Sequence, residues 1–533
     1  MTALVSHVGG GIHVISDDLG SDNITRRAVL RGLGLGVAGT SLGSVGLLSA
    51  CGSDPSGPSS ASGSSAATTA STAAITAQTP YDPNVPYWLQ GNFAPVASEE
   101  TVTSLKVSGT IPKELSGLFV RNGSNPPSGV SAHWFLGDGM FHGVRLENGK
   151  AQWYRNRYVE TPIHLAGKDL MDFGGIPGKA NNQSNVALVH HGGKLLTTGE
   201  VGWPFEIDPT DLSTIGPWGY DGKLGDTMTA HPKIDPTTGR MHFFGNEFLR
   251  PGVTYYSADP TGKIDVVSPI AMDEIVMIHD FAITDRDVIF WIGPVMFGAD
   301  PSGPLPQVPF HWDPNGPCKV GVMPLDGAGT DIRWIDIDPC FVFHGLNAHR
   351  DGDDVVLYVH QLAEAFGPAG DLVDSHLTRW TIGTGADQLT FSSDRLSDRP
   401  MDLPSHDRRH TGRPTRHGWC ATTTPPSSPH GFELAGICHI DTKSGKEDIW
   451  DPGPDLRAGE GVFVPTGKSE GDGYVIAYIW DRTTDLSSLA VFEAQDMAQG
   501  PIGQVELPLR VPFGFHGLWV DQANLKHGCR SAR

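Results

Sequence analysis

The chain has 533 residues, of which 38% are hydrophobic, so it is long enough to bury a large core. It contains 67 glycines and 41 prolines, about a fifth of all residues and without a collagen period, which argues against a helical bundle or coiled coil and favours a turn-rich β architecture. With 38 Lys and Arg against 60 Asp and Glu, the formal net charge is −22, and this acidic balance argues against nucleic acid as a partner.

Residues 1–50 predict an export signal. Residues 25–30 read TRRAVL, a twin-arginine pattern of the kind that the bacterial Tat exporter reads. A weakly apolar stretch leads to LSAC at 48–51, which is typical of bacterial lipoproteins, whose cysteine (here Cys51) is lipidated. A short transmembrane anchor is the alternative, but the glycines and serines between Gly34 and Ser44 make a poor span. We therefore expect a bacterial protein exported by the Tat route and lipid-anchored on the outer face of the cytoplasmic membrane.

Residues 51–80 are almost entirely Gly, Ser, Ala, Thr and Pro, which predicts a flexible tether. Residues 81–533 are then expected to form one folded domain. The remaining cysteines form no CxxC pair, so neither a disulfide framework nor a zinc–thiolate site is indicated, although a single bridge stays open. They are Cys318, Cys340, Cys420, Cys438 and Cys529.

From residue 81 onward, short β-rich runs alternate with turn signals. Residues 355–359 (VVLYV) and 474–479 (YVIAYI) are typical of buried strands. Hairpins in series, without a long amphipathic helix, predict an all-β fold, with a closed β-propeller favoured and a pair of β-sandwich domains as the alternative. The turn signals lie at residues 147–150, 191–194, 237–240, 350–353, 443–446 and 471–473.

Four of the 22 histidines occur in distinctive settings. They are His231 in TAHPK, His279 in IHDFA, His344 in FHGLNA and His516 in GFHG. Their spacings of 48, 65 and 172 residues exclude two ligands on one helix. In a propeller, however, inner strands far apart in sequence converge on one axis, so these side chains can meet there. Spacing alone does not single them out from the other histidines.

These four settings resemble the carotenoid cleavage oxygenase family. Residues 117–126 (GLFVRNGSNP) resemble the family's opening motif, residues 133–140 (HWFLGDGM) its GDGM segment, and residues 511–517 (VPFGFHG) its terminal ligand motif. The resemblance extends from about residue 85 to 522 in the family's order. It implies a seven-bladed β-propeller with a non-haem Fe(II) on its axis and with loops and short helices capping one face.

The resemblance also implies roles for individual residues. His231, His279, His344 and His516 would hold Fe(II), and four neutral imidazoles leave the metal its full charge and open positions for O2. Three carboxylates would orient the rings, namely Glu200, Glu460 and Asp402, the last in place of the family's usual Glu. Because Asp is one methylene shorter, either the backbone compensates or a water bridges the gap.

Two further departures from the family pattern surround the site. Ser184 stands where the family has a Thr that crowds one position at the iron, and His349-Arg350 replaces an aromatic-Glu pair. Other histidines are interpreted as structural (His133 and His142) or as exposed beside a hairpin turn (His190 and His191). No catalytic residue beyond the metal site is expected.

The implied reaction splits a conjugated C=C bond with O2 into two carbonyl products. Stilbene-cleaving members use a Tyr and a Lys, and the corresponding places here are Ala132 and Ile163. This favours a carotenoid or apocarotenoid substrate, with a stilbene or phenylpropanoid as the alternative. A non-catalytic lipoprotein that binds an apolar ligand is a third hypothesis. We also expect the lipid anchor, with an apolar patch at the tunnel mouth, to hold the protein on the membrane.

Overall fold

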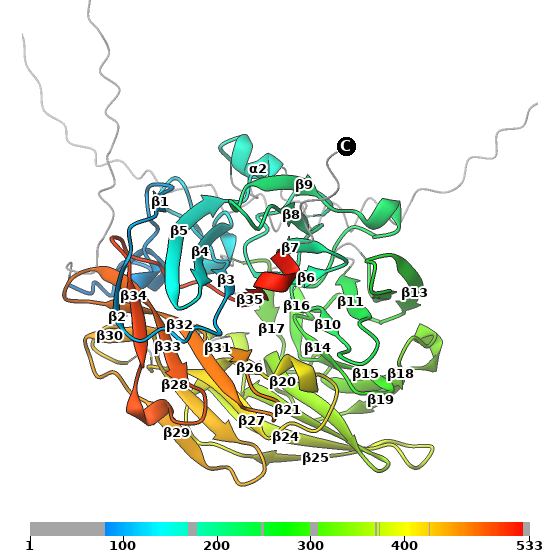
Figure 1. Cartoon of the computed structure of the whole chain (residues 1–533). Helices are drawn as coiled ribbons and strands as arrows, with labels where there is room; N and C mark the ends of the chain where they lie inside the picture. Colours follow the sequence, from blue (N-terminus) through cyan, green and yellow to red (C-terminus); the bar gives the residue numbers. More distant parts are fainter. Residues whose placement is uncertain are drawn as a thin grey trace, which may run out of the picture.

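The structure is a computed structural model that describes residues 80–168, 178–246, 250–298, 308–367, 370–372, 374–425 and 427–525. Seven antiparallel sheets surround a central axis, so the expected seven-bladed propeller is confirmed (Figure 1). The signal (1–50), Cys51, the tether up to residue 79 and Cys529 lie outside the described residues.

The strands of each blade follow one another from the axis outward. Blade 1 contains β35 (Gly517–Asp521), β3 (Gly117–Arg121), β4 (Met140–Glu147), β5 (Lys150–Tyr158) and β1 (Thr101–Val102). Blade 2 contains β6 (Ala187–His191), β7 (Lys194–Thr198), β8 (Phe205–Ile207) and β9 (Thr214–Pro217). Blade 3 contains β10 (Lys233–Ile234), β11 (Met241–Asn246), β12 (Val253–Ala258) and β13 (Ile264–Ile270). Blade 4 contains β14 (Phe281–Ile283), β15 (Asp287–Ile292), β18 (Lys319–Pro324) and β19 (Arg333–Asp336).

The remaining blades follow the same order. Blade 5 contains β20 (Phe341–Asp351), β21 (Asp354–Leu362), β24 (Ser375–Gly383) and β25 (Thr390–Arg395). Blade 6 contains β26 (Met401–His406), β27 (His417–Thr423), β28 (Leu434–Asp441) and β29 (Glu447–Trp450). Blade 7 contains β31 (Val462–Pro465) and β30 (Leu456–Ala458), both paired with β32 (Gly473–Asp481), then β33 (Leu486–Glu493), β34 (Gly503–Glu506) and β2 (Lys106–Gly109).

The remaining elements are short. Two extra ribbons pair β16 (Val295–Phe297) with β17 (Phe310–Trp312) and β22 (Ala365–Gly367) with β23 (Gly370–Leu372). The two α-helices of the described residues, α2 (Pro162–Leu165) and α3 (Gln522–Leu525), have four residues each. In this part of the chain no helix is long and apolar enough to cross a membrane. The 3-10 turns are η1 (Tyr87–Leu89), η2 (Gly91–Phe93), η3 (Trp134–Leu136), η4 (Tyr220–Gly222), η5 (Gly329–Asp331), η6 (Arg408–His410) and η7 (Met497–Gln499).

Ring closure joins the two ends of the fold. β35 pairs with β3 in blade 1, and β2 forms the outer edge of blade 7 by pairing with β34. A separate apolar cluster fills each interface between neighbouring blades. Each blade is therefore covered on both faces by the blades next to it. Burial between blades therefore holds the inner strands at fixed positions around the axis.

All six predicted turns are confirmed as connections between consecutive strands. At Asn148-Gly149 both residues have positive φ (51° and 73°), which matches the Asn-Gly hairpin signal between β4 and β5. The expectation that the His190-His191 pair is exposed is wrong, because His190 is half-buried and His191 is buried. The Nε2 atom of His191 lies 3.0 Å from the Gly239 carbonyl oxygen, because the hairpin tip packs against the β10–β11 turn. The four described cysteines are buried and free.

Candidate metal centre

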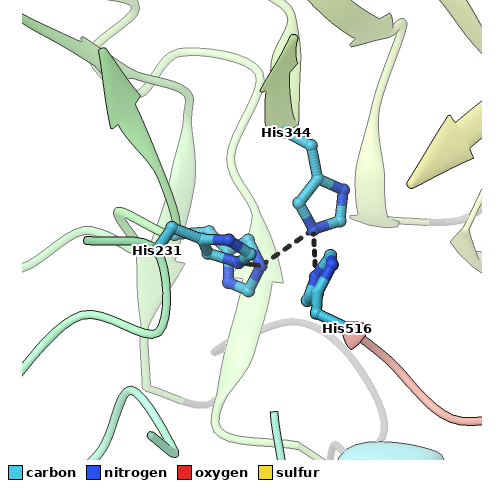
Figure 2. Close-up of side chains that lie close together, drawn as sticks. His231, His344 and His516 are labelled. Atoms are coloured by element: carbon cyan, nitrogen blue, oxygen red, sulfur yellow. Dashed lines mark hydrogen bonds between the residues drawn. The ribbon is translucent and has the colours of Figure 1, made fainter. Parts of the chain in front are cut away.

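Four histidines meet on the propeller axis, and each comes from a different blade. His231 and His279 lie two residues before the inner strands β10 and β14, His516 directly precedes β35, and His344 lies within β20. Because these strands line the axis side by side, residues up to 285 positions apart converge at one point. Figure 2 shows the rings of His231, His344 and His516 turned toward one another.

The ring nitrogens are close enough to share one ion. The Nε2 atom of His279 lies 2.9 Å from that of His231 and 3.3 Å from that of His344. The Nε2 atoms of His344 and His516 are 3.1 Å apart. All four candidate ligand atoms lie within 4.8 Å of one another. The structure therefore brings together the complete set of predicted histidines.

Three carboxylates accept a hydrogen bond from the opposite ring nitrogen, Nδ1. Glu200 lies 2.9 Å from His279, Asp402 2.7 Å from His344, and Glu460 2.9 Å from His516. These contacts assign the ring proton to Nδ1 and leave a lone pair on each Nε2. His231 has no carboxylate partner of this kind within the described ranges.

Asp402 reaches His344 directly, so the backbone compensates for its shorter side chain. The pairing of β26 with β27 shifts register between Asp402 and Ser405, a β-bulge that turns the strand toward the axis. Leu403, within the bulge, has φ +52°, and its N–H donates to Asp402 Oδ1 at 2.7 Å. No water bridge is needed in this geometry.

The electrostatics of the centre favour the neutral rings of His231 and His344, which keeps their lone pairs available. Burial lowers the pKa of His231 well below its usual value and that of His344 to about 4. Burial opposes ionisation of Asp402, but His344 outweighs it and lowers the carboxyl pKa to about 2. For His279, burial favours the neutral ring, whereas Glu200 raises its pKa above the usual value.

This donor set fits a transition-metal ion. Lone pairs on Nε2 atoms about 3 Å apart repel one another unless a cation lies between them. Imidazole nitrogens suit Fe, and the hydrogen-bonded carboxylates fix each ring and raise its basicity. Within the described residues, the centre thus has the composition that the sequence resemblance implies.

An apolar cavity opens at one side of the histidines. His279, His344 and His516 form part of its wall, together with aromatic side chains. The residues directly before two of these histidines, Phe343 and Phe515, belong to this wall. Among the described lining residues there is no Lys, Arg or Tyr. The aromatic members are Trp134, Phe135, Phe297, Phe310, Phe343, Phe432 and Phe515.

Ser184 does not line this cavity. Its hydroxyl donates to the Thr197 carbonyl oxygen at 3.3 Å, while the neighbouring Gln183 and Asn185 contribute to the wall. Ser184 has φ +49° and Glu200 has φ +61°, conformations that non-glycine residues rarely adopt. Such backbone strain concentrates at functional sites, and nothing in the residue types alone indicates it.

The remaining candidates are accounted for by other contacts. His133 caps η3 by accepting from the Phe135 N–H, and His142 contacts the Tyr154 hydroxyl at 2.8 Å, so both have structural roles. Arg350 forms an ion pair with Asp287. Ala132 is exposed, and Ile163 is buried outside the cavity.

Asp280, which follows His279 directly, belongs to the site although the sequence motifs did not predict it. Its carboxylate accepts from the Gly345 N–H at 2.9 Å and pairs with Lys233 at 2.7 Å. It thereby ties together the strands that carry His231, His279 and His344. In the sequence, only its position next to His279 could have indicated that Asp280 belongs to the site.

Comparison with known proteins agrees with the geometry. The sequence model of the retinal pigment epithelial membrane protein family matches residues 93–521. The carotenoid cleavage oxygenase of Mycobacterium tuberculosis is 34% identical over 81% of this chain and 97% of its own length. The carotenoid 9,10(9',10')-cleavage dioxygenase 1 of Pisum sativum is 33% identical over 84% of this chain and 92% of its own.

Solved structures show the same likeness. The lignostilbene dioxygenase of Pseudomonas brassicacearum superposes with a TM-score of 0.74 at 29% identity, over 82% of this chain and 99% of that protein. The matched family segment includes all four histidines and the three carboxylates. On this evidence the chain belongs to the carotenoid cleavage oxygenase family.

Proposed function

We propose that this protein is a non-haem Fe(II) dioxygenase that cleaves a conjugated C=C bond of a carotenoid or apocarotenoid into two carbonyl products. The observation that carries the proposal is the convergence of four histidine ring nitrogens beside an apolar cavity that three of these histidines line. The names of the similar enzymes from Mycobacterium and pea support the substrate class.

In this proposal, His231, His279, His344 and His516 hold Fe(II), and the metal supplies the site at which O2 is activated beside the alkene. Glu200, Asp402 and Glu460 hold the Nδ1 protons, which keeps each Nε2 lone pair directed inward. The Nδ1 proton stays on the ring throughout, so these carboxylates orient rather than transfer protons.

The cavity wall positions the substrate. Phe343 and Phe515 flank their histidines and place apolar surface next to the metal position. A polyene gains free energy by leaving water for such a wall, whereas a charged group would lose its hydration without compensation. The same wall excludes water from the reacting double bond.

A stilbene or phenylpropanoid is the second candidate substrate. It is favoured by the lignostilbene dioxygenase among the structural neighbours and by Ser375. The Ser375 hydroxyl is buried in the cavity wall without a hydrogen-bond partner among the described residues, so it can bind a hydroxyl group of a ligand. The third hypothesis, a non-catalytic binding protein, predicts no cleavage of either a carotenoid or a stilbene.

A substrate screen tests this proposal. Fe(II)-loaded protein is incubated with apocarotenals and, separately, with hydroxystilbenes, and the carbonyl products are identified by mass spectrometry. We expect two carbonyl products from an apocarotenal. Cleavage of hydroxystilbenes alone, with a raised KM in Ser375→Ala, would establish the second candidate, and no cleavage of either class would overturn the oxygenase proposal.

We also propose Tat export and lipid anchoring through Cys51. The support is the order of the twin-arginine pattern, LSAC and tether in the sequence. Tat export carries folded proteins, which suits a protein loaded with a metal before translocation. In a bacterial host, Cys51→Ser should move the protein from the membrane fraction to the soluble fraction, and an unchanged distribution would contradict the anchor.

A further inference from the structure

A second cavity reaches the histidines, and its wall combines apolar side chains with charged and polar ones, unlike that of the first cavity. It touches His231, His344 and His516 and is lined by charged and polar side chains. We refer to it as the axial channel. These polar members are Lys233, Asp280, Ser405, His406, Arg408, Thr411 and Glu460.

The axial channel and the apolar cavity lie on opposite sides of the histidine layer. At three places along the inner strands, a residue that lines the apolar cavity is followed two positions later by a residue that lines the axial channel. His344 and His516 themselves border both spaces. The pairs are Leu403 and Ser405 on β26, Phe343 and Gly345 around His344, and Phe515 and Gly517 around His516.

The charges of the channel wall are nearly balanced. Lys233 is neutralised by Asp280 at 2.7 Å, and Glu460 accepts from His516. Arg408 lies in η6 and is exposed, and its side chain forms no hydrogen bond or ion pair with another described residue, although Glu460 is its charged neighbour. Among the described residues of the channel wall, Arg408 is therefore the cation without a side-chain partner.

A hydrated divalent cation and a polyene need different routes to the same point. A cation that passed between phenylalanine side chains would lose its water without replacement, which carries a large desolvation penalty. Polar side chains and water in the axial channel can replace that hydration step by step. A bound apolar substrate would also fill the first cavity and leave the channel open.

We infer that the axial channel is the route by which the divalent metal ion reaches and leaves the four histidines, separately from the substrate cavity, and that the charge of Arg408 slows this exchange. The inference rests on the proposed metal centre. A positive charge along a path raises the barrier for a cation in both directions, so Arg408 would change rates far more than the equilibrium affinity.

Cobalt uptake by the apo form of the full protein tests the route. Co²⁺ is suitable because it resists oxidation and its visible absorption reports ligation, so rates come from stopped-flow traces and affinity from titration. At low ionic strength, Arg408→Gln should accelerate uptake about threefold and Arg408→Glu about tenfold, with nearly unchanged Kd. Both effects should shrink in high salt because exposed charges are screened.

Two bulky variants separate the routes. Arg408→Trp removes the same charge as Arg408→Gln but adds volume to the channel, so uptake at least tenfold slower than in Arg408→Gln can only be steric. Thr423→Trp adds the same side chain to the apolar cavity and should leave the uptake rate unchanged. Circular dichroism and final cobalt content establish that each variant is folded and loadable.

The outcomes are distinct. Equal rates in wild type, Arg408→Gln and Arg408→Glu, or slower uptake in Thr423→Trp alone, would overturn the channel inference while leaving the metal centre intact. If Arg408→Trp does not fold, the Gln and Glu variants decide. A wild-type protein that binds no Co²⁺ at all would overturn the proposed metal centre itself, and the channel inference with it.

Discussion

At the scale of single residues, Asp402 shows how backbone geometry replaces side-chain length. A bulge in β26 brings its carboxylate to 2.7 Å from His344 Nδ1, and its pKa is lowered to about 2 by that neighbour in spite of burial. The carboxylate is therefore ionised at neutral pH and accepts the ring proton. Its charge and its position both contribute to the basicity of His344.

Asp402→Asn should weaken metal binding about 10- to 100-fold, because the amide removes the negative charge but nearly preserves the shape. The measurement is the dissociation constant for Co²⁺ from competition with a chelator. Asp398→Asn makes the same chemical change at a side chain that is 96% exposed, and its Kd should equal that of wild type. Equal Kd values for Asp402→Asn and wild type would show that Asp402 does not support His344.

The resemblance of the motifs to the family predicted the four histidines and the three carboxylates Glu200, Asp402 and Glu460, and the structure brings them together. The sequence could not decide how Asp402 reaches its partner, because a register shift depends on the pairing of β26 with β27. It also could not show that the Ser184 hydroxyl donates to the Thr197 carbonyl oxygen, or that Ser184 adopts a positive φ, because both depend on the folded backbone. Local motifs indicate which residues form the site, whereas the directions of their side chains depend on the folded backbone.

At the scale of elements, the loop before β35 is the tightest support of the centre. A Cβ at Gly514 would lie against the Arg121 guanidinium and 2.7 Å from the Asn122 carbonyl oxygen. Arg121 is buried, and the metal-ligand candidate His516 comes two residues after Gly514. The position of His516 is thus set by close backbone packing between β3 and the final strand.

Gly514→Ala should lower the free energy of unfolding by about 1–3 kcal/mol, because the added methyl group forces this packing apart. It should also reduce metal occupancy through displacement of His516. Urea denaturation and metal analysis measure the two effects. Gly459→Ala is the matched control, since a Cβ there meets nothing within 4 Å and should change stability by less than about 0.5 kcal/mol. Equal stability of the two variants would contradict this account of the loop.

The hairpins were predictable because each depends on a few adjacent residues such as Asn148-Gly149. Ring closure was not, because β2 pairs with β34 across 400 positions, as at Lys106 and Glu506. The hairpin pattern favoured a propeller over two sandwiches, but no fixed-period motif marks the blades, so their number came from the family resemblance. Local sequence patterns do not indicate which distant strands pair with each other.

At the scale of the whole molecule, all seven blades contribute one residue to the centre. Four supply histidines, and blades 2, 6 and 7 supply Glu200, Asp402 and Glu460. The centre is therefore coupled to the closure of the entire ring. Any displacement of one blade moves either a ring nitrogen or the carboxylate that fixes it.

Acid should destabilise the apo protein through buried neutral histidines away from the centre. Burial lowers the pKa values of His242 and His439 to about 4. Between about pH 6.5 and 4 the unfolded chain binds more protons than the folded one, so the free energy of unfolding falls as pH falls, by up to about 1.4 kcal/mol per pH unit for each histidine. Urea denaturation at pH 7, 5.5 and 4.5 measures this slope, and a flat profile would contradict it.

The most direct test of the central claim is the iron content of the purified protein after anaerobic loading with Fe(II) and removal of unbound metal. The four-histidine centre predicts about one iron per chain in wild type and loss of that iron in His344→Ala, with the fold retained. Wild-type protein that holds no iron after loading, or a His344→Ala variant that holds as much as wild type, would contradict the account.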